Sequence, residues 1–227
     1  MVGVVILAFT VIPQLLAKSH QQVPLAVAIT ASIVQSGVLL LLAVWAGVMF
    51  SRPLGLEAPV IEAALSRSGT WRALKHQILP TLIVGIASGG ALLLTNRMTP
   101  SELLAAGQTM AFPLAAKVLY GGVVEEVLMR WGIMTTLIWL PWRFVQKKAS
   151  SPRVNYVLGA IFFAAVLFGA AHLPAAATLM GGSLTMPVVI FVILGNCVPG
   201  VMFGSCAYTQ LPESPSKRNP CNVSAAT

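Results

Sequence analysis

The sequence predicts an all-α protein, a polytopic transmembrane bundle with about six spanning helices. Of its 227 residues, 57% are hydrophobic and only 9% are charged, whereas charged residues make up ~25% of a typical soluble domain. The chain also contains several apolar segments, and the length of each is close to or above the ~17–25 residues that a spanning helix requires. These two observations exclude soluble α/β, all-β and disordered folds.

Six apolar segments are expected to be the spanning helices. They are residues 2–17, 23–50, 77–95, 111–141, 154–173 and 184–206. No Lys or Arg precedes the apolar core of the first segment, so we interpret it as a membrane helix and not as a cleaved signal peptide. Residues 1–206 are therefore predicted to form one transmembrane domain. Residues 207–227 are polar and rich in Pro and Ser, which predicts a disordered tail.

The positions of the basic residues predict how the bundle is oriented. Lys18 and Arg97 lie in loops on one side, and ten of the 14 Lys and Arg residues follow the second, fourth or sixth segment on the other side. These ten are Arg52, Arg67, Arg72, Lys75, Arg143, Lys147, Lys148, Arg153, Lys217 and Arg218. The positive-inside rule then places the basic loops and the N-terminus in the cytoplasm. We expect a multi-pass protein of the bacterial inner membrane.

Two further expectations concern the polar parts of the chain. The link from Ser51 to Gln77 fits either an amphipathic helix on the membrane surface or a solvated loop. No basic run carries interleaved aromatic residues, so no nucleic-acid partner is expected. The oligomeric state is left open by the sequence.

The fourth segment holds two adjacent acids, Glu125 and Glu126. A carboxylate inside a membrane is energetically costly, so this placement indicates a function. On a helix, Glu126 and Arg130 are four residues apart and share a face, while Glu125 is rotated by ~100° to a neighbouring face. We therefore expect Arg130 to hold Glu126 ionised and Glu125 to be available as a general base. A structural ion pair or an ion path is the alternative.

The fifth and sixth segments supply further candidates. Phe168 and His172 are spaced i, i+4 on one face of the fifth segment. Counted at ~1.5 Å per residue from the basic loop, Glu125 and His172 reach a similar depth in consecutive antiparallel helices, so they can meet. Asn196 begins a stripe of small and polar residues that permits close helix contact. Packing roles for His172 and for this stripe are the alternatives.

The pattern Glu-Glu-x-x-x-Arg (125, 126, 130), followed in the next helix by Phe-x-x-x-His (168, 172), resembles the CAAX prenyl protease and bacteriocin-processing (CPBP) family. These intramembrane endopeptidases include abortive-infection and bacteriocin-immunity proteins. The resemblance implies that Glu125 activates the attacking water and that His172 assists at the same centre. It also implies that Glu126 and Arg130 support the geometry of the helix or of the substrate, and that Phe168 lines the site. Membrane lipid and a membrane-anchored peptide or protein substrate are the implied partners.

The resemblance covers residues 112–206, and it leaves the cofactor open. Family members are often described as metalloproteases, and a glutamate-dependent mechanism without a metal has also been proposed. Glu125 and His172 are the ligands that this chain offers to zinc, but a complete zinc set is hard to assemble with one histidine in these segments. Zinc is therefore a candidate cofactor, and none is firmly predicted.

The sequence departs from the family pattern at one place. The family continues with a helix bearing His-x-x-x-Asn or His-x-x-x-Asp, which contributes to stabilising the oxyanion, whereas no histidine follows His172 here. A truncated or frame-shifted chain is one explanation, and a partner that completes the site is another; Asn196 is a candidate substitute. Because loss of one oxyanion donor lowers a rate ~10²–10³-fold, the departure predicts an inactive or weakly active chain.

Two other function classes are weighed against the protease. A small transporter or proton-coupled protein would use Glu125, Glu126 and His172 as an ion path. Inverted repeats or paired broken helices would favour it, and the sequence shows neither. A non-catalytic membrane immunity or scaffold protein would keep the fold without the chemistry.

Overall fold

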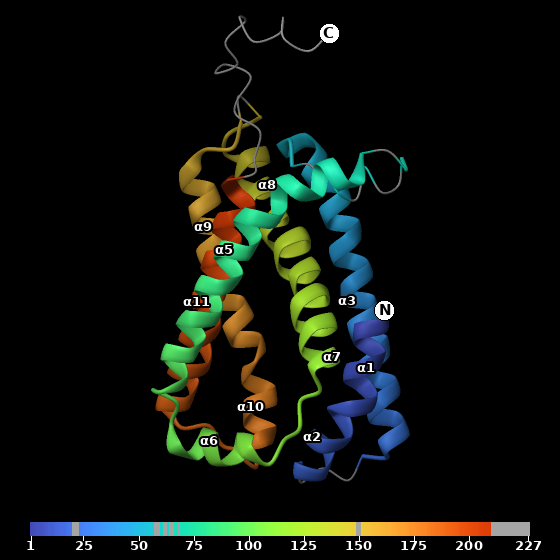
Figure 1. The fold of residues 1–227 in the computed structure, drawn as a ribbon, viewed down its shortest axis with the longest axis vertical. Helices are drawn as coiled ribbons and strands as arrows, with labels where there is room; N and C mark the ends of the chain where they lie inside the picture. Colours follow the sequence, from blue (N-terminus) through green and yellow to red (C-terminus); the bar gives the residue numbers. More distant parts are fainter. Residues whose placement is uncertain are drawn as a thin grey trace, which may run out of the picture.

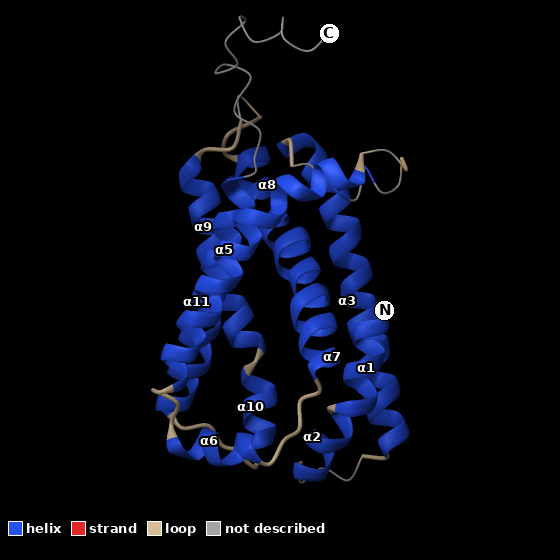
Figure 2. Ribbon diagram, in the orientation of Figure 1, coloured by secondary structure: helices blue, strands red, loops and turns tan. Residues whose placement is uncertain are grey.

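The structure, a computed structural model, describes residues 1–19, 23–56, 60, 63, 66, 67, 69–148 and 151–209. Every regular element in this part of the chain is a helix (Figures 1 and 2), which confirms the all-α prediction. The elements are α1 (Val2–Thr10), α2 (Ile12–Lys18), α3 (Leu25–Leu54), α5 (Thr70–Asn96), α6 (Ser101–Gln108), α7 (Leu114–Ala116), η1 (Lys117–Val124), η2 (Val127–Met134), α8 (Thr135–Phe144), α9 (Val154–Ala171), α10 (Leu173–Leu179) and α11 (Met186–Thr209).

Among the described residues, four helices are long and apolar enough to cross a membrane. They are Leu25–Leu54, Gln77–Asn96, Val154–Leu179 and Met186–Ala207, and a shorter apolar helix spans Val2–Lys18. Large apolar side chains on these helices are exposed, as Leu41 and Leu93 show at 70% and 73%. Such a surface is suited to lipid. A soluble protein exposes isolated apolar side chains, whereas whole apolar helix faces are exposed here.

The fourth predicted segment is helical from Leu114 to Phe144 without a break. Within it α7, η1, η2 and α8 follow directly on one another, and η1 and η2 are π-helical. Glu125 and Glu126 form the short junction between the two π-helical stretches. We call the whole path from Leu114 to Phe144 the motif helix. Stretches of π-helix are rare and frequent at functional sites.

The motif helix packs on α3 through two glycines. Gly47 of α3 lies against the indole of Trp131, and Gly132 of η2 lies against Ala43. A Cβ atom at Gly132 would be 2.6 Å from the Cβ of Ala43, so no side chain fits there. The close approach of small residues, which drives helix association in membranes, holds the two helices together.

Helices α9 and α11 form a second close pair by the same means. A Cβ atom at Gly169 would lie 2.6 Å from the carbonyl oxygen of Ile193, and one at Gly200 would lie 2.8 Å from the Cβ of Ala165. Gly200 belongs to the stripe predicted in the sixth segment, which therefore does lie at a helix contact. This pair carries His172 at the end of α9.

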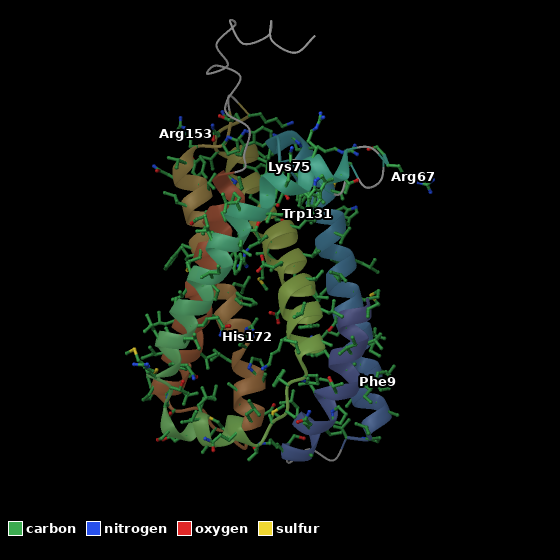
Figure 3. All side chains as sticks on the ribbon, viewed as in Figure 1. Phe9, Arg67, Lys75, Trp131, Arg153 and His172 are labelled. Atoms are coloured by element: carbon green, nitrogen blue, oxygen red, sulfur yellow. The ribbon has the colours of Figure 1, made fainter. Side chains whose placement is uncertain are left out.

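Two clusters of buried apolar residues lie at opposite ends of the bundle. One joins the C-terminal half of the motif helix to α9 and includes Met134, Ile138 and Val157. The other consists of Ala176, Val188 and Val192, and it packs where α10, α11 and α6 meet. In Figure 1, α6 lies at the end opposite α8. His172 lies between the two ends in Figure 3.

Basic residues from three of the predicted cytoplasmic loops and helix ends lie at one end of the molecule. Arg67, Lys75 and Arg153 all lie at the end that α8 occupies (Figure 3), whereas α2, which ends at Lys18, lies at the other end (Figure 1). This separation is the one on which the predicted orientation depends. Met1 lies beside Gly37, near the middle of α3, so the first described residue is at mid-depth in the bundle.

Two sequence-based expectations fall partly or wholly outside the described residues. In the link from Ser51 to Gln77, α3 continues to Leu54 and α5 begins at Thr70, so both ends of the link are helical; residues 57–59, 61, 62, 64, 65 and 68 lie outside the described part. Helix α11 continues to Thr209, three residues into the predicted tail, and the remainder of that tail lies outside the described residues.

Candidate functional site

Glu125 and His172 face each other across two helices. The Glu125 Oε1 atom, on the motif helix, is 3.9 Å from the His172 Nε2 atom, at the point where α9 ends and α10 begins. The side chains are 20% and 36% exposed, so both are half-buried and still accessible. The depth match expected from the sequence therefore brings an acid and an imidazole together.

Phe168 holds the imidazole of His172 in one orientation. The Nδ1 atom lies 2.8 Å from the carbonyl oxygen of Phe168. Because a carbonyl oxygen only accepts hydrogen bonds, Nδ1 is the donor in this contact. The other ring nitrogen, Nε2, faces Glu125, and it is an acceptor when the ring is neutral. The phenyl ring of Phe168 also packs edge-to-face on the imidazole, with centroids 4.7 Å apart and an interplanar angle of 80°.

The gap between Glu125 and His172 has the size of a water bridge. At 3.9 Å the two atoms are too far apart for a direct hydrogen bond. A water molecule that donates one O–H to each acceptor, at ~2.8 Å, spans such a gap. The arrangement can therefore hold a water molecule between a carboxylate and a neutral imidazole.

Glu126 and Arg130 form the ion pair that their spacing predicts. The Arg130 Nη2 atom is 3.2 Å from the Glu126 Oε1 atom. The same Nη2 atom lies 3.5 Å from the carbonyl oxygen of Pro199 in α11, a contact that the sequence did not indicate. The arginine side chain is only 12% exposed, and its Nε atom is buried without a hydrogen-bond partner among the described residues. Arg130 thus links the motif helix to α11.

Asn196 directs its amide group toward its own helix. Its Nδ2 atom donates a hydrogen bond of 2.8 Å to the carbonyl oxygen of Val192. This donor is therefore engaged one turn back along α11, as is common for polar side chains in membrane helices. To act as the oxyanion donor suggested from the sequence, Asn196 would have to break this bond.

The part of the chain that carries these residues matches a known protein family. Residues 107–210 match the family model described as type II CAAX prenyl endopeptidase Rce1-like. This segment is thus similar to the Rce1-like family. The match confirms the resemblance to CPBP endopeptidases and implies an intramembrane protease of the CAAX type. No curated protein and no solved structure matched the chain.

The Rce1-like segment and the apolar helices together identify an integral membrane protein. The segment contains the whole motif helix, together with α9, α10 and α11. All six candidates predicted from the sequence lie in it. They are Glu125, Glu126, Arg130, Phe168, His172 and Asn196.

A residue that the sequence analysis missed is Tyr120 in the Rce1-like segment. Its side chain interacts with Ser36 of α3 and, electrostatically, with Glu125. The phenol of Tyr120 is thus within range of an electrostatic interaction with the carboxylate of Glu125.

The Rce1-like segment offers few ligands to a metal. Glu125 and His172 are two donors, whereas zinc sites use three or four protein ligands. The carboxylate of Glu126 is paired with Arg130. In the parts of the chain that are described, no group of three or more His, Cys, Asp or Glu side chains is placed to hold a metal ion. This donor set does not fit a zinc site.

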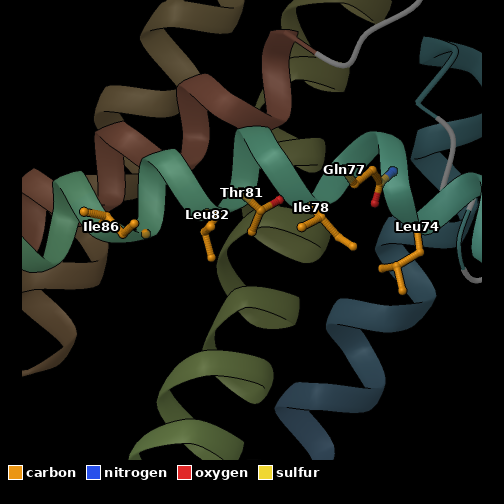
Figure 4. Close-up of a pocket in the computed structure, with 7 residues that line it drawn as sticks. Leu74, Gln77, Ile78, Thr81, Leu82 and Ile86 are labelled. Atoms are coloured by element: carbon orange, nitrogen blue, oxygen red, sulfur yellow. The ribbon is translucent and has the colours of Figure 1, made fainter.

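A separate apolar hollow of about 620 Å³ lies along α5 (Figure 4). It includes none of the candidate residues. Its lining comes from one face of that helix: Leu74, Gln77, Ile78, Thr81, Leu82, Gly85 and Ile86. The hollow is thus distinct from the Glu125–His172 pair.

Proposed function

We propose that this protein is an intramembrane endopeptidase that hydrolyses a peptide bond with a water molecule activated by Glu125. The observation that carries the proposal is the 3.9 Å approach of the Glu125 carboxylate to the Nε2 atom of His172. Similarity to the Rce1-like family supports the reaction class. The geometry supports the roles of the two residues.

The proposed reaction begins with a water molecule held between the two acceptors. Glu125 takes one proton from it while the water oxygen attacks the carbonyl carbon of the scissile bond. His172 accepts a hydrogen bond from the second O–H and so orients the lone pair with which the water oxygen attacks. The carbon–nitrogen bond then breaks, and the proton held by Glu125 passes to the leaving nitrogen, which yields a carboxylic acid and an amine.

Phe168 and the Glu126–Arg130 pair support this centre in the proposal. Phe168 fixes the tautomer and orientation of His172 through its carbonyl group and its ring. The Glu126–Arg130 ion pair, with the contact of Arg130 to Pro199, holds the motif helix and α11 in register. These roles place the reacting atoms and do not contribute atoms to the reaction.

The proposed substrate is a peptide or protein that is anchored in the membrane. The Glu125–His172 pair lies between the two ends of the bundle, so a scissile bond must enter the depth of the membrane to reach it (Figure 3). The apolar surface of α3 and α5 is proposed to contact lipid. The bacterial inner membrane, with the basic end in the cytoplasm, is the proposed location.

The test is cleavage of a membrane-anchored peptide by the purified protein in liposomes. Glu125→Gln removes the proton acceptor and keeps the size of the side chain, and we expect it to lower the cleavage rate ~10²–10⁴-fold. His172→Ala is expected to lower the rate as well. Glu102→Gln is the matched control and should cleave like the wild type, because Glu102 is exposed on α6, where it accepts a hydrogen bond from Thr185.

Two results would contradict the proposal. Cleavage that is unchanged in Glu125→Gln would remove this residue from the mechanism. Proton or ion flux into the liposomes that depends on Glu125, with no cleavage by the wild type, would instead favour the transporter class.

A further inference from the structure

Most of the helical glycines at helix contacts have a clear structural reason. At each of them a Cβ atom would come within 3.0 Å of a neighbouring helix, so no larger residue fits. These positions are Gly3, Gly47, Gly132, Gly169, Gly200 and Gly204.

Gly121 and Gly122 in η1 have no such reason, and what distinguishes them from the other helical glycines with open surroundings is their place beside Glu125. Those others are Gly85, Gly89, Gly90, Gly107, Gly159 and Gly195. A Cβ atom at Gly122 would have the carbonyl oxygen of Lys117, in its own helix, as its nearest neighbour, at 4.0 Å. Neither glycine has a positive φ angle, so the backbone conformation does not require them. Glycine also destabilises a helix interior relative to alanine. Two adjacent glycines here therefore weaken the helix without serving its packing.

Their position relates them to the two acids. Gly121 lies one turn before Glu125, and Gly122 lies one turn before Glu126. A Cβ atom at Gly121 would be 3.7 Å from the Glu125 Oε2 atom, so this carboxylate extends along the helix toward Gly121. The helix beside the reactive pair is thus bare main chain.

The helices that carry His172 do not pack closely on this main chain in the described part of the protein. The stretch η1 packs mainly on α1, whereas α9 and α11 pack on η2. Gly122 is exposed and Gly121 is half-buried. Next to an accessible carboxylate and imidazole, this leaves an uncovered stretch of backbone that another polypeptide can approach closely.

We infer that the main chain of the peptide substrate docks on Gly121 and Gly122. The inference rests on the proposed function. Attack requires the scissile carbonyl carbon to come within ~3–3.5 Å of the water oxygen, and that water lies beside the motif helix. Two backbones approach this closely only where no Cβ atom stands between them, which is a known use of glycine. The glycines therefore set how near the scissile bond comes to Glu125.

The consequence is a limit on side-chain size at position 122. An added side chain would push the substrate main chain away from the water, and a displacement of ~1 Å can lower a rate ~10²-fold. We expect Gly122→Ala to lower kcat/KM several-fold and Gly122→Leu to lower it ~10²-fold. A substrate with glycine on both sides of the scissile bond should recover part of the loss in Gly122→Ala.

The experiment compares position 122 with Gly159. Gly159 is also helical and exposed, and a Cβ atom there would meet nothing within 4 Å. Cleavage of the membrane-anchored peptide is measured for Ala and Leu variants at both positions, with thermal unfolding in detergent as the measure of folding. We expect Gly122→Ala to unfold at the wild-type temperature or above and still to cleave more slowly, while both Gly159 variants cleave like the wild type.

The outcomes separate the inference from the proposed function. Wild-type cleavage that needs Glu125 and is equally fast in both Gly122 variants would overturn the docking inference alone. An equal loss at positions 122 and 159 would also overturn it, because the effect would then be general to helix glycines. Wild-type cleavage that survives Glu125→Gln would overturn the proposed function, and the docking inference with it.

Discussion

The contacts of Arg130 show how one side chain serves two helices. Its Nη2 atom reaches both the carboxylate of Glu126 and the carbonyl oxygen of Pro199. The guanidinium group suits this role, because it presents several donors in a fixed plane, whereas lysine offers a point charge. The pair is thus an ion pair within the motif helix and a link to α11.

We predict that Glu126 and Arg130 are energetically coupled. Arg130→Met leaves Glu126 without its cation in a half-buried position, which is unfavourable. The double variant Glu126→Gln, Arg130→Met removes both charges and should recover part of the lost stability. A double-mutant cycle on the free energy of unfolding in detergent should give a coupling of about 0.5–3 kcal/mol.

A conservative variant tests the link to Pro199 in the same series. Arg130→Lys keeps the positive charge beside Glu126 but lacks the planar fork that reaches two acceptors. We expect a stability between those of the wild type and Arg130→Met. Strictly additive effects in the cycle would show that the ion pair contributes nothing beyond the two separate side chains.

At the scale of elements, two close helix pairs carry the two halves of the site. The α3–η2 contact holds the motif helix and therefore Glu125, and the α9–α11 contact holds His172. Both pairs depend on glycines that leave no room for a side chain. The distance between the acid and the imidazole is consequently set by backbone contacts at some remove from either residue.

We predict that Gly169→Ala disturbs both folding and activity. The added methyl group would lie 2.6 Å from the main-chain oxygen of Ile193, and a backbone atom cannot rotate away, so α9 and α11 must separate. Overpacking of this kind costs about 1–3 kcal/mol. The shift also moves His172, three residues further along the chain, and the cleavage rate should fall.

Thermal unfolding and peptide cleavage check this prediction together. Gly159→Ala is again the matched control, since its surroundings are open. A Gly169→Ala protein with wild-type unfolding temperature and rate would show that the α9–α11 contact adapts without moving the site.

At the scale of the whole molecule, the bundle has a basic end and an opposite end, with the reactive pair between them. Arg153 lies at the basic end (Figure 3), and Arg97 follows α5 at the end where α6 lies (Figure 1). The positive-inside rule predicts that the basic end is cytoplasmic.

Cysteine labelling tests this orientation. In a background without the native cysteines (Cys197, Cys206 and Cys221), single substitutions Arg97→Cys and Arg153→Cys are exposed to a membrane-impermeant thiol reagent in intact bacterial cells. We expect labelling at position 97 in intact cells, and at position 153 only after permeabilisation. The opposite pattern would invert the proposed topology.

The sequence by itself determined the membrane fold, the Glu126–Arg130 pair and the similar depth of Glu125 and His172. All three depend on local quantities: composition, the spacing of residues along one helix, and the rise per residue. Such quantities are nearly independent of what else the helix touches, so they could be predicted without the structure.

Only the tertiary structure decided which side chains meet and how closely. The 3.9 Å gap between Glu125 and His172 and the contact of Arg130 with Pro199 depend on rotations and separations of helices. These are set by glycine contacts between segments that are distant in sequence, and by a π-helical stretch that changes which residues share a face. The periodicity of one segment predicts neither the contacts between distant segments nor the change to a π-helix.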